Sequence, residues 1–171
     1  MLRLVRPLAI LSLAVLAGCG TTQRLAAAQD VHALLVSIRD NDRQTFEAHI
    51  DRRALTDQLQ GRLEREVAGA RAPDEWRAVG ALLAGPIAQV AGEALIRPEV
   101  FRSAAEAYGY GPDKKIPNVF AIASVLKPLP DGKVCATRRK NGPCLLTFAD
   151  QEGTWRLVRY DGDPRDLRLR R

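Results

Sequence analysis

Few side chains in this 171-residue chain could perform acid–base or nucleophilic chemistry. A His49–Asp51 pair could orient an imidazole, and histidine is the usual general base near neutral pH. A catalytic triad would also need a nucleophile placed against that imidazole. Ser37, Ser103 and Ser124 lie in no strand–turn–helix elbow, and Asp51 is better explained as a helix cap. We therefore predict no catalytic residue.

Other site chemistries are also weakly represented. The pairs Glu64/Glu66 and Asp161/Asp163 could in principle act as glycosidase carboxylates, but nothing in the sequence places either pair across a cleft. A zinc site would need more ligands than two cysteines and two distant histidines can offer at a recognised spacing. We expect no metal and no cofactor.

The most specific motif lies at the N-terminus. Two arginines precede an apolar run over residues 8–16, and the run ends in the letters LAGC at residues 16–19. The run is far shorter than the ~20 residues of a membrane-spanning helix. This order of charge, apolar run, small residues and cysteine resembles the lipobox of bacterial lipoproteins, the alternative being an ordinary export signal with a chance cysteine.

The lipobox resemblance implies a covalent anchor. It implies cleavage before Cys19 and attachment of lipid to the sulfur and the new amino group of that residue. Because Gly20 follows rather than an aspartate, the analogy with lipoprotein sorting favours the outer membrane, at its periplasmic face. Several acyl chains are enough for stable attachment to a bilayer.

Lipidation of Cys19 would leave Cys135 and Cys144 as a pair. These two cysteines flank a turn-rich run that contains Asn141-Gly142. Symmetric pairing about this turn would bring them together on adjacent strands, and a disulfide is the expected state in an oxidising periplasm. Two free buried thiols and, less favoured, a metal site are the alternatives.

Composition and length favour one folded domain. Hydrophobic residues make up 46% of the chain and charged residues 27%, which is too apolar for a disordered chain and sufficient for a core. Removal of the first 18 residues lowers the basic residues from 26 to 24 against 20 acidic ones, and this mild excess favours anionic neighbours. The expected segments are a signal peptide at 1–18, a tether at 19–28, a single domain at 29–161 and a basic tail at 162–171.

The first half of the domain carries helical periodicity. Apolar residues lie three or four apart from 31 to 38 and every four residues from 55 to 67. We expect Asp30 and Asp51 to cap these two helices. Residues 79–96 are small and apolar but contain Gln89 and Pro86, which argue against a membrane span. We expect two short helices there, broken at Gly85-Pro86 and packed inside the domain.

The second half predicts strands at 118–126, 133–137, 144–149 and 154–160. Helices followed by strands indicate an α+β fold, with N-terminal helices packed on one face of a small C-terminal antiparallel sheet. The aromatic residues Phe120, Phe148, Trp155 and Tyr160 are expected to fill its core.

Several of these residues resemble a known pattern. Asp42, Phe46 and the run 49–51, followed by Leu55 and Leu59, resemble the core of small exported bacterial domains grouped as domain-of-unknown-function family 2939. The helix start at 96–99 and the late hairpin at 144–161 are also similar, so the resemblance spans roughly residues 30–161.

The chain departs from the family pattern at two places. Arg52-Arg53 stand where the family often has an aromatic residue and a proline, and the Cys135/Cys144 pair is an addition. The resemblance implies an α+β fold and an exported location. It implies no activity, because the family has no established one.

These features predict a lipid-anchored protein at the periplasmic face of the outer membrane. We expect a non-enzymatic binding or accessory module, tied to the membrane through Cys19 and contacting an envelope protein or an anionic envelope component. The alternatives are a carrier of a small apolar ligand between helices and sheet and, less favoured, an envelope hydrolase. Nucleic acid is not an expected partner, because no aromatic stacking platform is interleaved with the basic clusters.

Overall fold

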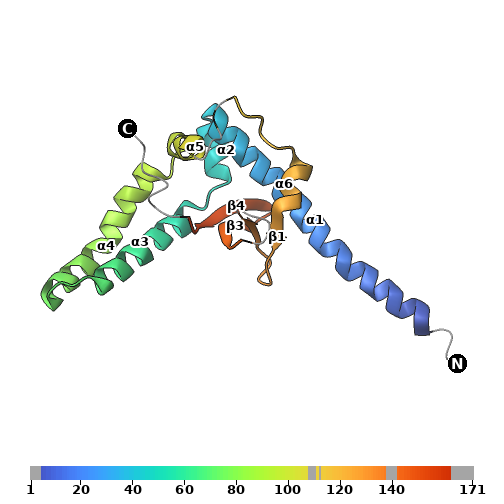
Figure 1. The fold of residues 1–171 in the computed structure, drawn as a ribbon, viewed down its shortest axis with the longest axis horizontal. Coiled ribbons are helices and arrows are strands. Elements are labelled where there is room, and N and C mark those ends of the chain that lie inside the picture. Colours follow the sequence, from blue (N-terminus) through green and yellow to red (C-terminus); the bar gives the residue numbers. More distant parts are fainter. Residues whose placement is uncertain (1–4, 108–110, 112, 138–141, 163–171) are drawn as a thin grey trace.

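Helices come first and strands second along the chain. A computed structural model describes residues 5–107, 111, 113–137 and 142–162, with side chains from residue 20 onward. The helices are α1 (Val5–Asp40), α2 (Arg43–Ala48), α3 (Arg52–Gly69), α4 (Asp74–Leu95), α5 (Pro98–Ala107) and α6 (Val119–Val125). The strands are β1 (Leu126–Pro128), β2 (Val134–Thr137), β3 (Cys144–Gln151) and β4 (Thr154–Tyr160). The expected α+β class is confirmed (Figure 1).

The helix α1 is the central element of the molecule. It runs without a break through residues 19–28, the segment expected to be a tether. Ala27 and Ala28 are fully buried there and belong to the same buried cluster as Ile122 of α6 and Leu126 of β1. Asp30 therefore lies inside α1, and its predicted role as a helix cap is wrong.

The four strands form one antiparallel sheet in the order β1-β2-β3-β4. A disulfide joins Cys135 of β2 to Cys144 of β3, with the two Cα atoms 5.5 Å apart. The predicted pairing is thus confirmed. Residues 138–141 of the predicted turn, and 163–171 of the predicted basic tail, lie outside the described residues.

The strand predicted at 118–126 is wrong, because most of this segment is the helix α6. The Asn118 side chain accepts a hydrogen bond from the Ala121 N–H at 2.9 Å and so caps the helix. Only Leu126–Pro128 continue as a strand. Phe120 is 76% exposed on α6, so its expected place in the core is also wrong.

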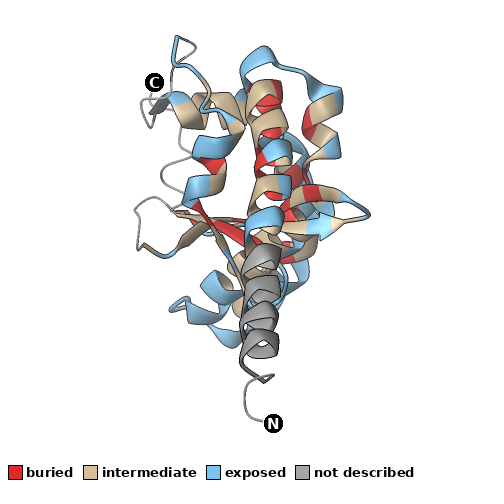
Figure 2. Cartoon of the chain, turned by 90° about the vertical axis from the view of Figure 1, so that its right-hand side faces the viewer, coloured by how far each residue is buried: buried red, intermediate tan, exposed pale blue. Residues whose placement is uncertain are grey.

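The hydrophobic core lies between α1, the α2–α3 junction and the sheet. Figure 2 shows buried residues concentrated along α1 and on the strands. Phe46 of α2 is fully buried and meets the ring of Phe101 edge-on, with ring centroids 5.3 Å apart. Phe148, Trp155 and Leu157 supply the sheet side of the same cluster.

The outer edge of β4 is closed by the helical half of the chain. The Trp155 N–H donates to Asp30 Oδ2 at 2.7 Å. Ile50 forms a parallel bridge with Leu157, whose N–H donates to the His49 carbonyl and whose carbonyl accepts from the Asp51 N–H. The Gln58 side chain then pairs with both the N–H and the carbonyl of Tyr160. Partners on α1, the α2–α3 junction and α3 therefore satisfy this strand edge.

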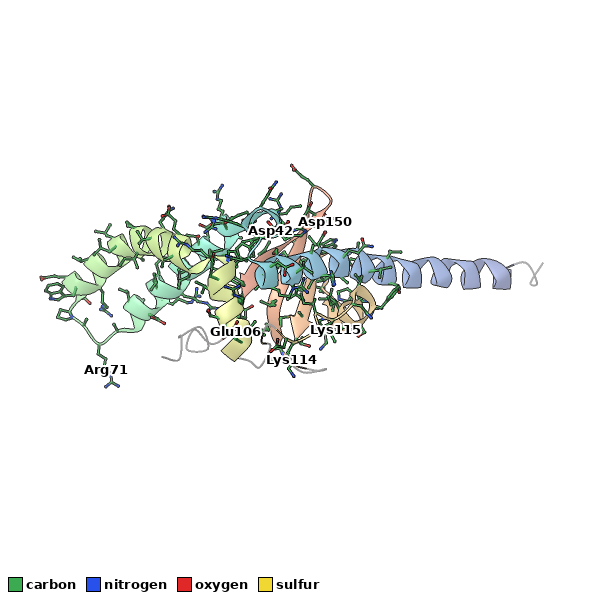
Figure 3. All side chains as sticks on the ribbon, turned by 90° about the horizontal axis from the view of Figure 1, so that it is seen from above. Asp42, Arg71, Glu106, Lys114, Lys115 and Asp150 are labelled. Carbon is green, nitrogen blue, oxygen red and sulfur yellow. A yellow bond between two sulfur atoms is a disulfide. The ribbon has the colours of Figure 1, made fainter. Side chains whose placement is uncertain are left out.

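The helices α3 and α4 form an antiparallel arm that projects from the body (Figure 1). Arg71, between the two helices, lies at its far end (Figure 3). Close approach depends on small residues of α4, since a Cβ on Gly92 would lie 2.6 Å from Thr56 Oγ1 and one on Gly80 would lie 2.8 Å from Val67. The α3-facing side of α4 is accordingly lined by Ala84, Ala88 and Gly92.

The break predicted at Gly85-Pro86 is wrong, because α4 continues through Pro86. Pro86 removes one backbone donor. Both Pro86 and Leu82, four residues earlier, are exposed. The expectation that this segment packs inside the domain is also wrong, since much of α4 is exposed.

Arg52 holds the base of the arm to the body. Its Nη1 donates to the Gly92 carbonyl at 3.2 Å and its Nη2 to the Ile96 carbonyl at 2.8 Å. The same guanidinium pairs with Glu47 of α2. A cation at the C-terminal end of a helix also suits the helix dipole. Arg52, the first of the two arginines that depart from the family pattern, therefore has a structural role.

Replacement of Arg52 should weaken the fold more than replacement of its neighbour. Arg52→Ala removes the donor to the Ile96 carbonyl and to the Glu47 carboxylate, and one of the two donors to the Gly92 carbonyl, which should cost about 1–3 kcal/mol. Arg53→Ala, at a side chain that is 92% exposed, should change the free energy of unfolding by at most about 0.5 kcal/mol. Urea denaturation of both variants measures the difference, and equal losses would contradict this role of Arg52.

Candidate functional site

His49, which the sequence places two residues before Asp51, pairs with a carboxylate on another helix. Its Nε2 lies 3.5 Å from Asp30 Oδ1, and its Nδ1 lies 2.7 Å from the Thr45 carbonyl. Because a carbonyl can only accept a hydrogen bond, Nδ1 is the donor in that contact. His49 thus pairs with Asp30 rather than with Asp51, and the imidazole joins α1 to the end of α2.

Asp51 acts as the predicted helix cap. Its Oδ1 accepts from the Ala54 N–H at 2.9 Å, and its Oδ2 accepts from the Gln151 side chain at 2.6 Å. Burial by itself would raise the pKa of this carboxyl group. The hydrogen bonds from Ala54 and Gln151, together with the positive charge of Arg156, outweigh burial and hold the pKa below its ordinary value of 3.8.

The serine hydroxyls considered as nucleophiles are bonded within their own helices. Ser37, Ser103 and Ser124 each donate their hydroxyl to a carbonyl three or four residues earlier in their own helix. Within the described part of the chain, no group of three histidine, cysteine or acidic side chains is placed to hold a metal ion. The residues around His49 thus form a structural junction.

Two shallow hollows lie on the described surface. The larger, of about 390 Å³, is lined by residues of α1 and of the β1–β2 and β3–β4 hairpins, among them Gln23, Gly132 and Asp150. The smaller, of about 260 Å³, lies near the far end of the arm between α3 and α4. Both are open to solvent rather than enclosed. The larger one lies where α1 meets the sheet, since its lining comes from both.

The most unusual surface is the outer side of α4. Leu82 is 79%, Val90 70% and Trp76 69% exposed, and three further large apolar residues are about half exposed. We define the apolar face of α4 as Trp76, Val79, Leu82, Leu83, Ile87 and Val90. A patch of this kind on a soluble domain marks a contact site. Among the described helices, α4 is also the one long and apolar enough to cross a membrane by length and composition.

Sequence reasoning missed this surface because it treated residues 79–96 as uniformly apolar. The segment in fact carries two different stripes. Small residues recur every four positions from Gly80 to Gly92 and face α3. Large residues recur three or four positions apart from Trp76 to Val90 and face outward. Separating apolar residues by size would have revealed both faces of α4.

The proposed lipidation site lies in α1. Cys19 falls within the helix, but its side chain is outside the described residues.

One family model matches the chain over residues 13–104, and its description is a protein of unknown function, DUF2939. The match spans α2, α3 and α4 whole, with parts of α1 and α5, and ends before the sheet. The resemblance of the late hairpin at 144–161 lies outside it. No curated protein matches the chain, and no solved structure matches it.

Removal of the Asp30 carboxylate should expose the dependence of β4 on α1. Asp30→Ala leaves the Trp155 N–H without its acceptor, at a cost of about 1–3 kcal/mol in the free energy of unfolding. Asp30→Asn keeps an acceptor oxygen and should lose less. Chemical denaturation measures both variants, and an equal loss in the two would contradict the role of this hydrogen bond.

The contribution of the Asp51 charge should disappear in acid. A carboxyl group whose pKa is lowered by folding stabilises the fold at pH values above its unfolded pKa, and this stabilisation is lost as the pH falls through the folded pKa. Asp51→Asn should therefore lower stability at pH 6 by a modest amount, within about 1 kcal/mol because asparagine also caps helices.

The difference between wild type and Asp51→Asn should shrink as the pH falls below 3.8, the ordinary pKa of the group. Thermal unfolding of both proteins across that range tests this. Asp57→Asn controls for the loss of one negative charge from the same helix. A difference that grows toward low pH would contradict the argument.

Proposed function

The chain belongs to the DUF2939 family of proteins of unknown function. We propose that it is a lipid-anchored periplasmic protein of the outer membrane. In this proposal it is a non-enzymatic binding or accessory module of the cell envelope. The anchor is lipid on Cys19, and the contact surface is the apolar face of α4.

The observation that carries the proposed location is the N-terminal motif. A charged start, a short apolar run and the LAGC letters before Gly20 have the order and lengths of a lipoprotein signal. The Cys135–Cys144 disulfide supports the same location, since such bonds persist in oxidising compartments.

The apolar face of α4 supports a binding role. An exposed apolar surface adds nothing to the stability of a lone domain and lowers its solubility, so it is usually covered by a partner. The larger hollow lies between α1 and the sheet but is open to solvent, so it does not enclose an apolar ligand as the carrier alternative requires. The hydroxyls of Ser37, Ser103 and Ser124 each bond a carbonyl of their own helix, which does not favour the hydrolase alternative at His49.

Intact-mass analysis of the protein purified from its native membrane tests the anchor. The wild type should begin at residue 19 and carry acyl mass. Cys19→Ser should carry none, because the sulfur that accepts the lipid is missing. A double variant, Cys135→Ser with Cys144→Ser, should keep the acyl mass and so separates lipidation from disulfide formation. Native wild-type protein that begins at Met1, or that carries no acyl group, would contradict the proposal.

A further inference from the structure

The apolar face of α4 is wide as well as exposed. At about 100° per residue, its six side chains cover an arc of roughly 140° on the side turned away from α3. No charged residue lies between Arg77 and Glu93. The apolar stripe through which two helices pair in a coiled coil is narrower than this arc, since it uses only two positions in seven. The occupant of this surface must therefore be apolar and must adapt to a broad convex shape.

We propose that α4 lies in the interface of a lipid bilayer, with its apolar face in the acyl region and α3 on the water side. This inference rests on the proposed lipid anchor, which would keep the arm close to a membrane. It assigns the bilayer a second contact with the protein, one that does not involve Cys19.

The packing of α3 decides between lying in the membrane and crossing it. The two helices contact each other along the arm, from Gly80 beside Val67 to Gly92 beside Thr56. If α4 crossed the bilayer, the ionic side chains of α3, such as Arg53 and Asp57, would enter hydrocarbon at high cost. Immersion to about 5–10 Å, as for interfacial helices, buries the apolar face and leaves α3 in water.

The charge of the arm indicates which lipid chemistry it meets. Residues 52–95 contain six basic and six acidic residues, so the arm has no formal net charge. Attraction to anionic headgroups is therefore not what would hold it to the surface. Contact with hydrocarbon is the remaining source of affinity, and binding should not depend on anionic lipid. Trp76, near the far end of the arm, is a residue type enriched at membrane interfaces.

A second copy of the chain fits this surface less well. From Trp76 to Val90 the helix rises only about 20 Å, and a helix is about 10 Å wide. A single α4–α4 contact would then bury much less than the ~800 Å² per partner of a standard stable interface. It would also leave Leu82, at the margin of the arc, in water.

The two tryptophans provide the test. Trp76 is 69% exposed on the apolar face, whereas Trp155 is 6% exposed in the core. The full-length native protein is reconstituted into phosphatidylcholine vesicles whose acyl chains carry bromine, a short-range quencher of tryptophan emission. Trp76→Phe supplies the emission of Trp155 alone, and subtraction from wild type gives that of Trp76.

Brominated lipid should reduce the Trp76 emission at least twofold relative to unbrominated vesicles, and should leave the Trp155 emission unchanged. Adding phosphatidylglycerol should not alter the reduction. Leu82→Glu should abolish it, because a carboxylate would be drawn into the acyl region. Arg53→Glu, on the water side, is the matched control and should leave it intact. Circular dichroism of each variant verifies that the arm is folded.

Three results would overturn the inference. Trp76 could remain unquenched by bromine and accessible to aqueous iodide, which would place α4 in water. It could be shielded from both quenchers while crosslinking captures a dimer, which would assign the face to a second copy. Bromine quenching could also survive Leu82→Glu. Intact mass of the same samples reports the anchor separately, so an acylated protein without quenching refutes only the role of α4.

Discussion

Closure of the outer edge of β4 is the interaction on which the rest of the structure depends. An open strand edge presents unpaired N–H and C=O groups, and here the helical half supplies their partners. Asp30 comes from α1, the segment 49–51 from the α2–α3 junction and Gln58 from α3. Because these partners belong to separate elements, docking β4 positions all of them at once. Asp51 shows the coupling, since its backbone bonds β4 while its side chain caps α3.

The region matched by the family model is not a closed folding unit in this chain. It ends at residue 104, before the first strand. Yet Phe46 and Leu55, both within it, belong to the same buried cluster as Phe148 and Leu157 of the sheet. The helices α1, α2 and α3 would leave this cluster half exposed without the strands. The disulfide between β2 and β3 reinforces the element that completes the core.

The α3–α4 arm is held together by other contacts than the body, whose core is built from large buried side chains. Its inner contact is made by small residues that let the two helices approach closely, and its base is held by Arg52. Neither feature requires large apolar residues on the outer side of α4. Those side chains are therefore unexplained by the fold of the chain itself, whereas the charged residues on α3 have an ordinary solvated role. This contrast between the two helices indicates that a partner covers the outer side of α4.

The amino-acid sequence by itself determined the features that arise within a few residues. The cap at Asp51, the hairpins of the second half and the pairing of Cys135 with Cys144 follow from local hydrogen bonding and turn formation. Tertiary structure decided the rest. Residues 118–126 are compatible with strand or helix until Asn118 caps them and α1 packs against them. The partner of His49 is Asp30, which lies on another helix, α1. How much of α4 is buried depends on how much of it α3 can cover. Such contacts join distant segments, so local patterns in the chain do not specify them.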